Sequence, residues 1–387
     1  MSRLLIIIFV VIIVMIAGVF WLRPNETPLV APVNIARALA SDTVGYARAM
    51  APHRFSFPAD HGPHPDFKNE WWYFTGNLAT PSGRRFGYEW TVFRFAVTPP
   101  DSAVQTRTSH WATRQLYMAH FAVTDVYGGH FESFERFSRG AVGLAGARAD
   151  PFRVWLEDWR VAASDESMPA MTIQAREGET AIGLTLRPVK PLVLQGDRGL
   201  DRKGEGLGNA SYYYSMTRLE TKGAITVNGK SYEAEGLSWM DREWSTSALD
   251  DGQVGWDWFA LQRTDGRELM YYQLRNRDGS ISETSGGMQV DPQGTARRLK
   301  HAGVNLTVLA RWKSPHSGAE YPARWRFRTE SLDLTVTPLI ADQELSGTVR
   351  YWEGAVRFEG TDAGAAISGF GYVELTGYEE SGVVPGS

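Results

Sequence analysis

The sequence predicts an all-β protein that follows an N-terminal membrane helix, and three observations lead to this prediction. After about residue 51, short runs rich in Val, Phe, Tyr, Trp and Thr recur between Gly, Asp, Asn and Pro. Apolar and polar residues in these runs alternate with a period of about two, and no run has a long period of about 3.6. In contrast, residues 4–22 are apolar and uncharged, close to the roughly 20 residues that a spanning helix needs.

Composition limits the classes of function. The 387 residues suffice for two domains or one large barrel. With 40 basic and 44 acidic residues, a net charge of -4 and no basic run, a nucleic-acid partner is not expected. The chain has no Cys, which excludes disulfides, thiolate zinc sites and a Cys nucleophile. Its 14 Trp favour a wide aromatic core or a cavity for a large apolar ligand.

The first element is the apolar segment LLIIIFVVIIVMIAGVFWL. It is flanked by Arg3 and Arg23 and predicts a membrane helix within residues 1–24. A cleaved signal peptide has a shorter apolar region of roughly 7–15 residues, followed at once by a small-residue site, whereas Ala38-Leu39-Ala40 lies well downstream. We therefore expect an uncleaved anchor that places the body at the periplasmic or extracellular face of the cytoplasmic membrane. Cleavage and secretion are the alternative.

Residues 25–50 form the predicted spacer. They contain Pro28 and Pro32, and residues 35–50 suit a short amphipathic helix. The predicted strands come after this spacer and include EWWYFTGNL at 70–78 and RRFGYEWTVFRFAV at 84–97.

One predicted hairpin assigns residues to faces. If Asp265 and Gly266 form a two-residue turn, Trp258 faces Gln273 on the neighbouring strand. Alternation then gathers aromatic, amide and basic side chains on one side: Trp256, Trp258, Gln262, Tyr271, Gln273 and Arg275. Because buried amides need hydrogen-bond partners, this mixture suits the lining of a ligand site, with a solvent-exposed sheet face as the alternative.

Six segments carry a resemblance to a known family. They are Phe57–Leu78, ASYYYSMTRL at 210–219, GLSWMDREW at 236–244, GWDWFALQ at 255–262, YWEGAV at 351–356 and GYVELTGY at 371–378. Together they resemble the AttH-like branch of the hydroxyneurosporene synthase, or carotenoid 1,2-hydratase, family over nearly everything after the spacer. The resemblance implies two lipocalin-like antiparallel β-barrels side by side, for which we expect residues 51–245 and 246–387.

The resemblance also implies a chemistry for Asp241. In the carotenoid branch, water adds across a terminal isoprenoid C=C, which requires a proton donor, aromatic faces that stabilise a cation and a positioned water. Burial among Trp239 and Trp244 would raise the pKa of Asp241 and make it the donor. Trp256 and Trp258 would be the rings that face the cation.

The sequence departs from the hydratases near this acid. Their segment is richer in histidine, whereas here Met240 precedes Asp241 and Arg242 follows it, which leaves the reaction open. Residues 241 and 242 point to opposite faces of a strand, so the adjacent Arg does not decide the matter. Asp241, Arg242 and Glu243 could instead form an ion-pair network where the barrels meet.

Two histidines precede the first predicted strand. His61 and His64 lie in a segment rich in Gly and Pro, so His61 is a candidate catalytic residue, and a lid over the first barrel is the alternative. With Glu70 or Asp66 they could also hold a metal, to which His120 could add a ligand. Their spacing matches no known metal motif, so we expect no metal and no cofactor. His120 is therefore retained as a candidate ligand contact.

Alternation along EWWYFTGNL puts Glu70 and Trp72 on one face and Trp71 and Tyr73 on the other. A carboxylate beside aromatic rings is either paired, for which Arg94 is the candidate, or has a raised pKa. Glu70 is thus a candidate catalytic residue and Trp72 a candidate ligand contact.

Three functions follow from these observations. The first is an exported, membrane-tethered protein that binds an apolar small molecule, such as an isoprenoid or lipid, with an ABC-type transporter as a candidate partner. The second is a hydro-lyase of the carotenoid 1,2-hydratase type, or a cyclase, acting on a polyene. The third is a structural or partner-binding role without a ligand. A hydrolase built from Asp257, Glu353 and Glu374 is conceivable, but the spacing of these acids does not favour it.

Overall fold

The computed structural model describes residues 43–100, 109–163, 170–247, 249–250 and 252–378. The membrane helix expected within residues 1–24 and the spacer up to residue 42 lie outside these ranges. Residues 43–50 form a turn and extended chain. Over the described ranges, no helix is long and apolar enough to cross a membrane, and the helical elements are the short 3-10 turns η1 (Ala59–His61) and η2 (His301–Gly303).

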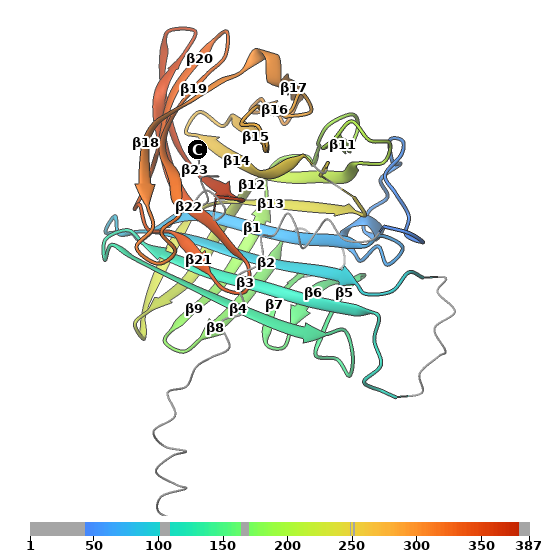
Figure 1. The fold of residues 1–387 in the computed structure, drawn as a ribbon. Coiled ribbons are helices and arrows are strands. Elements are labelled where there is room, and N and C mark those ends of the chain that lie inside the picture. Colours follow the sequence, from blue (N-terminus) through green and yellow to red (C-terminus); the bar gives the residue numbers. More distant parts are fainter. Residues whose placement is uncertain (1–42, 101–108, 164–169, 248, 251, 379–387) are drawn as a thin grey trace, which may run out of the picture. The chain divides into compact units, whose positions relative to one another are not determined.

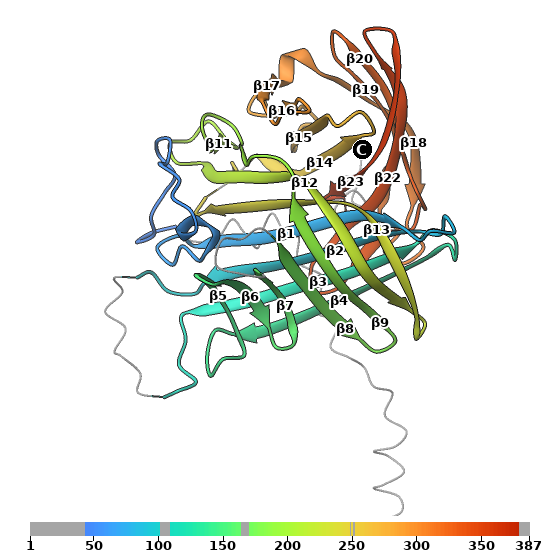
Figure 2. The same cartoon turned by 180° about the vertical axis from the view of Figure 1, so that it is seen from behind.

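The first sheet has thirteen strands in the order β4-β3-β2-β1-β13-β12-β9-β8-β7-β6-β5, with β10 and β11 paired to β12. The bounds are β1 Asn69–Ala79, β2 Arg85–Ala96, β3 Gln115–Asp125, β4 His130–Arg139, β5 Ala145–Ala149, β6 Phe152–Leu156, β7 Trp159–Ala163, β8 Met171–Glu177, β9 Thr180–Pro188, β10 Val193–Leu194, β11 Leu200–Arg202, β12 Ala210–Val227 and β13 Lys230–Ser245. The sheet curls into a nearly closed barrel (Figures 1 and 2), in which β6 approaches β2, β3 and β4.

The interior of this barrel is aromatic. Trp72 and Phe74 of β1, Trp90 of β2, Phe121 of β3 and Trp159 of β7 are fully buried in one core. Because successive side chains of a strand point to opposite faces, every second residue of these strands enters the barrel. The residues between them face outward, toward the second sheet where it covers the barrel.

The second sheet has ten strands in the order β17-β16-β15-β14-β23-β22-β20-β19-β18, with β21 paired to β22. The bounds are β14 Gln253–Arg263, β15 Glu268–Asn276, β16 Gly286–Val290, β17 Ala296–Lys300, β18 Asn305–Lys313, β19 Glu320–Arg328, β20 Leu332–Pro338, β21 Glu344–Ser346, β22 Arg350–Asp362 and β23 Ala365–Leu375. Its concave side holds a separate core that includes Phe259, Trp325 and Trp352.

The all-β prediction is confirmed, but two full barrels do not form. The second sheet is a half-barrel (Figure 1), because its edge strands β17 and β18 are not hydrogen-bonded to each other in the described part of the chain. Closing a barrel requires the two edges to pair in a consistent stagger. The structure is therefore a nearly closed barrel beside a half-barrel.

The register predicted for the β14–β15 hairpin is wrong by one residue. Trp258 pairs with Tyr272, not with Gln273, because the turn has three residues between Arg263 and Arg267, with Gly266 at a φ of 84°. A three-residue turn with Gly in the left-handed conformation is a common hairpin connection. A shift of one residue moves every side chain of β15 to the opposite face.

The predicted binding face is therefore divided between two sides. Tyr272 and Leu274 share the face of Trp258, which packs against the first barrel in a core that joins the two sheets. Tyr271 lies instead in the core of the half-barrel. Gln273 and Arg275 lie on the same side of β15 as Tyr271, since they occupy alternate positions.

Candidate functional site

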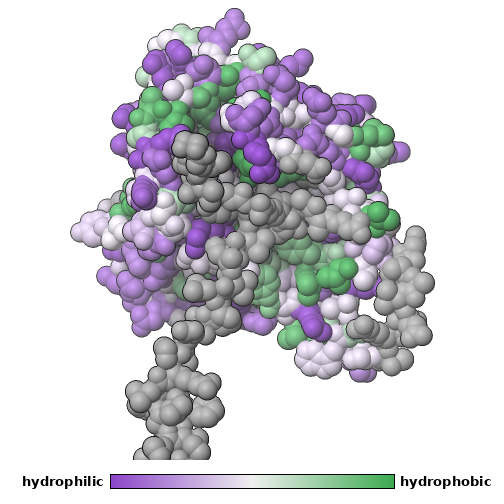
Figure 3. Space-filling model, viewed as in Figure 1, coloured by the Kyte–Doolittle hydropathy of each residue, from purple (hydrophilic) through white to green (hydrophobic). Residues whose placement is uncertain are grey.

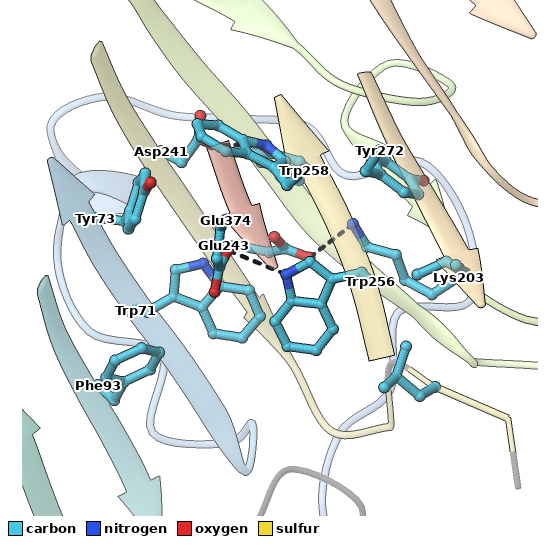
Figure 4. Close-up of a pocket in the computed structure, with 13 residues that line it drawn as sticks. Trp71, Tyr73, Phe93, Lys203, Asp241, Glu243, Trp256, Trp258, Tyr272 and Glu374 are labelled. Carbon is cyan, nitrogen blue, oxygen red and sulfur yellow. Dashed lines mark hydrogen bonds and ion pairs between the residues drawn. The ribbon is translucent and has the colours of Figure 1, made fainter. Parts of the chain in front are cut away.

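The two sheets enclose a pocket between them. It is lined by side chains of β1, β2, β12 and β13 from the barrel, of β14, β15 and β23 from the half-barrel, and of the segments after β11 and β13: Trp71, Tyr73, Phe93, Lys203, Tyr213, Asp241, Glu243, Leu249, Trp256, Trp258, Tyr272, Leu274 and Glu374. The empty space among these side chains is about 710 Å³ when the solvent at the open mouth is included, and about 70 Å³ of it can hold the centres of water molecules. Figure 4 shows carboxyl groups near the middle with aromatic rings around them.

Strand alternation explains why these residues meet. Trp71 and Tyr73 on β1, and Asp241 and Glu243 on β13, are pairs separated by two positions, so each pair faces the same side of its strand. Trp256 and Trp258 repeat this spacing on β14. The outward residues of the barrel thus meet the convex face of the half-barrel.

Asp241 is the most enclosed acid of the pocket. Tyr213 Oη donates to its Oδ2 over 2.6 Å, while Ser215 Oγ and Trp239 Nε1 donate to Oδ1 over 2.5 Å and 2.7 Å. Burial raises the pKa of Asp241 to about 7, and the nearby Glu243 adds to the rise, although the three hydrogen bonds oppose it. Near neutral pH this carboxyl is therefore protonated in about half of the molecules.

Glu243 lies beside Lys203, the cation of the pocket. Lys203 Nζ lies 3.3 Å from Glu243 Oε1 and 2.8 Å from Asp201 Oδ2, and 4.1 Å from the centre of the Tyr272 ring. Burial raises the pKa of Glu243, while Lys203 and a hydrogen bond from Ser211 oppose the rise. Lys203, held by two carboxylates, stays charged, because its pKa is raised despite burial.

Glu374, which is partly buried, is a third acid in the pocket. Trp256 Nε1 donates to its Oε2 over 3.0 Å, as Figure 4 shows. Burial raises the pKa of Glu374 to about 8, and the charges of Glu89, Glu243 and Asp241 add to this effect. Glu374 is therefore mostly protonated at neutral pH.

Aromatic rings form the remaining walls. The Trp258 ring lies edge-to-face with Tyr73 at 5.3 Å and with Trp239 at 6.3 Å, and its Nε1 donates to Tyr213 Oη over 3.2 Å. Ring faces attract a positive charge, and the buried carboxyls beside them can donate protons. This arrangement suits the protonation of an apolar substrate and the stabilisation of the resulting cation.

Four of the residues predicted from the sequence are brought together here. Asp241, Trp256 and Trp258 line the pocket, and Trp239 binds Asp241. Gln262 lies farther along β14, where its Nε2 donates to the carbonyls of Thr217 and Ser238 and ties the two sheets together.

The candidates near the first strand lie elsewhere, at the barrel. Glu70 is fully buried and bridges Arg94 and Arg242, so the predicted Arg94 pair is present and the pKa of Glu70 is lowered, because the two cations outweigh the effect of burial. Trp72 belongs to the barrel core, and its Nε1 donates to the carbonyl of His61.

His61 is buried near Arg242, which pairs with Glu70. Its Nδ1 lies 2.6 Å from Tyr214 Oη, and burial together with the charge of Arg242 lowers its pKa to about 4. The ring of His64 stacks on Trp244 at 3.8 Å. These contacts favour a structural role for the segment that enters β1.

The other candidates also lie outside the pocket lining. His120 contacts Tyr351 and Glu135. Tyr271 Oη lies 3.1 Å from His301 Nδ1. Gln273 and Arg275 both donate to Asp257, at 2.8 Å and 3.0 Å. In the described ranges, no group of three or more His, Asp or Glu side chains is arranged to hold a metal ion.

Several pocket residues were not among the predicted site residues. Trp71 and Glu243 could have been found, because alternation places them on the faces of Tyr73 and Asp241. Tyr272 was missed because the predicted register was wrong. Lys203 follows the three-residue strand β11, where the sequence carries no pattern that indicates a partner.

Comparisons with known proteins agree with this architecture. The family model described as AttH-like matches residues 48–378. The crystal structure of a protein from Nitrosomonas europaea assigned as an AttH superimposes with a TM-score of 0.75 and 36% identity, covering 86% of this chain and 99% of that chain.

Kievitone hydratases are more distant relatives. The structure of the enzyme from Nectria haematococca has a TM-score of 0.64 at 14% identity and covers 86% of this chain and 96% of that chain, which shows a common fold. Kievitone hydratase from Fusarium solani subsp. phaseoli is 25% identical over 190 residues, 43% of this chain and 49% of that protein. The match therefore spans about half of this relative.

The family match covers both sheets and all strands that line the pocket, from β1 to β23. The Nitrosomonas europaea relative is matched over nearly its whole length. This chain is therefore a member of the AttH-like family.

Proposed function

We propose that this protein is a hydro-lyase that adds water across a C=C bond of an apolar, isoprenoid-type substrate held between the two sheets. The observation that carries the proposal is Asp241, a buried acid that can hold its proton near neutral pH, surrounded by aromatic rings. The relationship to kievitone hydratase, a hydratase by name, supports this class of reaction.

The reaction begins with the proton of Asp241. The electron pair of the C=C bond takes this proton, so that a C–H bond forms, the O–H bond breaks and the neighbouring carbon becomes a cation. The faces of Trp256 and Trp258 stabilise that cation. The oxygen of water then forms the C–O bond and loses one proton to a pocket carboxylate, which leaves a neutral alcohol.

Asp241 is a better donor than Glu374 for a reason of geometry. Three hydrogen bonds converge on the Asp241 carboxyl, whereas Trp256 gives Glu374 a single one. Hydrogen bonds to a carboxylate strengthen as its negative charge develops, so they favour the transition state over the ground state. Glu243, two positions from Asp241 on the same face, is the candidate base that accepts the proton of water.

The surroundings of the pocket favour an apolar substrate. Phe93 lines the edge of the pocket. Phe95 lies on the same face of β2 and pairs with Leu116 of β3, so the apolar surface extends from the pocket along the outer face of the barrel. Leu116 and Phe137 are exposed, and Figure 3 shows hydrophobic residues gathered over the ends of β2 and β3. A long apolar molecule could lie along this strip while its reactive end reaches Asp241.

The test is incubation of the protein with isoprenoid alkenes in ¹⁸O-labelled water, followed by mass spectrometry. The expected product gains one water with labelled oxygen, and Asp241→Asn abolishes its formation. Asp125→Asn is the matched control, because Asp125 is equally buried but pairs with Arg84 away from the pocket. Product formation by Asp241→Asn at the wild-type rate would exclude Asp241 as the donor.

A binding role without turnover is the second candidate, supported by the apolar walls of the pocket and the apolar segment at residues 4–22. In this proposal the protein is tethered at the periplasmic or extracellular face of the membrane and passes its ligand to an ABC-type transporter. Protease treatment of spheroplasts tests the location, since an exported body is digested while the cells stay intact. A bound apolar molecule that is released unchanged would favour this role over catalysis.

A further inference from the structure

A second group of buried acids lies beside the pocket and has no part in the hydration described above. Glu89 on β2 and Glu353 on β22 are both fully buried, and Glu353 pairs across the ladder with Glu374 of the pocket. Tyr351 donates a hydrogen bond to Glu89 and lies two positions from Glu353 on the same face of β22, which places the two acids near each other. The charge of Glu89 accordingly raises the pKa of Glu353 further above its usual range than burial alone.

A chain of hydrogen bonds connects Glu89 with the surface. Tyr351 Oη donates to Glu89 Oε1 over 3.1 Å and lies 2.6 Å from His120 Nδ1. On its other side, His120 Nε2 lies 3.1 Å from Glu135 Oε2. The side chain of Glu135 is 14% exposed and that of His120 only 1%. The chain therefore leads from solvent to a buried acid.

A second connection leads from Glu353 to the pocket. Tyr73 Oη donates to Glu353 Oε1 over 2.7 Å, and Tyr73 lines the pocket. The remaining oxygens, Glu89 Oε2 and Glu353 Oε2, are buried without a hydrogen-bond partner among the described residues. Because a buried carboxylate oxygen without a partner is costly, both acids would not be ionised together.

We propose that Glu89 and Glu353 share one proton and that this pair exchanges protons with solvent through Tyr351, His120 and Glu135. Through Tyr73, the pair would also replace the proton that Asp241 loses in each turnover. This last step rests on the proposed function, whereas the proton pathway itself does not. The two oxygens without a hydrogen-bond partner, Glu89 Oε2 and Glu353 Oε2, are the atoms that hold the shared proton.

The pathway has two states that differ by the position of one proton. In the first, His120 is an imidazolium that donates to Glu135 and Tyr351, and Tyr351 donates to ionised Glu89. In the second, Glu89 is protonated and donates to Tyr351, Tyr351 donates to Nδ1 of neutral His120, and Nε2 still donates to Glu135. His120 loses the proton that Glu89 gains, and the tyrosine hydroxyl reverses its direction.

The groups around the pair limit how much charge it can carry. The titratable side chains that act on it are Tyr73, His120, Tyr351, Tyr372 and Glu374. His120 is the one base among these five, and it is shared with Glu135. His120 therefore cannot neutralise both Glu89 and Glu353. One proton on this pair of carboxyls removes the repulsion between their two negative charges.

Infrared spectroscopy of the full-length chain at pH 7 tests the proposal without a substrate. The difference spectrum of the wild type against the double variant Glu89→Gln/Glu353→Gln should show the loss of one protonated-carboxyl band, not of two. After transfer to heavy water, this band should shift on the order of tenfold more slowly in Tyr351→Phe than in the wild type, because the relay has lost its hydroxyl.

Tyr214→Phe is the matched control, because Tyr214 also lies 2.6 Å from a histidine nitrogen but belongs to the barrel core. Its exchange rate should equal that of the wild type. If Tyr351→Phe does not fold, His120→Asn takes its place. An unchanged spectrum or the loss of two bands in the double variant, or equal exchange rates in Tyr351→Phe and the wild type, would overturn the proposal. Normal exchange with no hydration of any alkene would refute the proposed function alone.

Discussion

Replacement of Tyr213 by Phe tests whether hydrogen bonding sets the acidity of Asp241. The hydroxyl of Tyr213 is the donor to Asp241 Oδ2, at 2.6 Å. Ser215 and Trp239 bind the other oxygen. The variant therefore leaves Oδ2 of the carboxylate without this donor while the ring and its packing remain.

The magnitude follows from the strength of one hydrogen bond to a charged group. Such a bond contributes about 1.5–3 kcal/mol, and one pKa unit corresponds to about 1.36 kcal/mol. Loss of the Tyr213 donor should therefore raise the pKa of Asp241 from about 7 by about 1–2 units. The direction is upward, because the lost bond stabilised the ionised form.

The assay is the pH dependence of kcat/KM, which reports ionisations of the free enzyme. The protonated form of Asp241 is the active one, so the wild-type rate should fall as the pH rises through about 7. In Tyr213→Phe, the fall should occur about 1–2 units higher. Infrared titration of protein with ¹³C-labelled Asp follows the same ionisation without a substrate.

An unchanged or lowered midpoint in Tyr213→Phe would refute this account of Asp241. Tyr214→Phe serves as the control, because the Tyr214 hydroxyl lies beside His61 in the barrel, and it should leave the midpoint where it is. A higher midpoint in both variants would point to a general loosening of the fold.

Three further predictions concern stability and binding. Glu70→Gln leaves the buried Arg94 and Arg242 without their carboxylate and should lower the free energy of unfolding in urea by about 3–5 kcal/mol. As the control, Glu220→Gln at the exposed pair with Arg187 should change it by less than about 0.5 kcal/mol. Equal effects would contradict the assignment of Glu70 to the core. The pKa of His61 is lowered to about 4 in the folded protein, against about 6.5 in the unfolded chain. Neutral His61 therefore contributes its full stabilisation above about pH 6.5, and this stabilisation is lost as the pH falls to about 4. The loss of stability over this range is about 3 kcal/mol. His61→Gln should flatten the pH dependence of unfolding over this range, and an unchanged slope would argue against a buried neutral histidine. Trp258→Leu should weaken the binding of an apolar ligand about tenfold in calorimetry, since an aromatic contact contributes about 0.5–1.5 kcal/mol beyond its area, while Trp111→Leu, at an exposed ring, should leave the affinity unchanged.

The sequence by itself determined the class of fold and part of the site. Alternation with a period of two placed Trp71 and Tyr73 on one face of β1 and Trp72 on the other, as the structure has them. It also separated Asp241 from Arg242, which lie respectively in the pocket and beside Glu70 in the barrel. Such assignments succeed because the two faces of a strand are set by local geometry alone.

The contents of the pocket were decided by the tertiary structure. A turn of three residues instead of two moved Tyr271, Gln273 and Arg275 away from Trp258 and brought Tyr272 to it. The two turn lengths differ by one residue, and a sequence containing Asp265-Gly266 suits both. Register therefore depends on how the whole sheet packs, which the residues of the hairpin do not specify.

Long-range contacts explain the remaining differences. Lys203 meets Glu243, and Glu89 meets Tyr351, across 40 and 262 positions of the chain, respectively. Charge and burial at such positions depend on which sheets come together. The pKa values of Asp241 and Glu374 therefore depend on the packing of the two sheets as well. Local patterns determine which side of a strand a residue faces, but the packing of one sheet on the other determines what that residue meets.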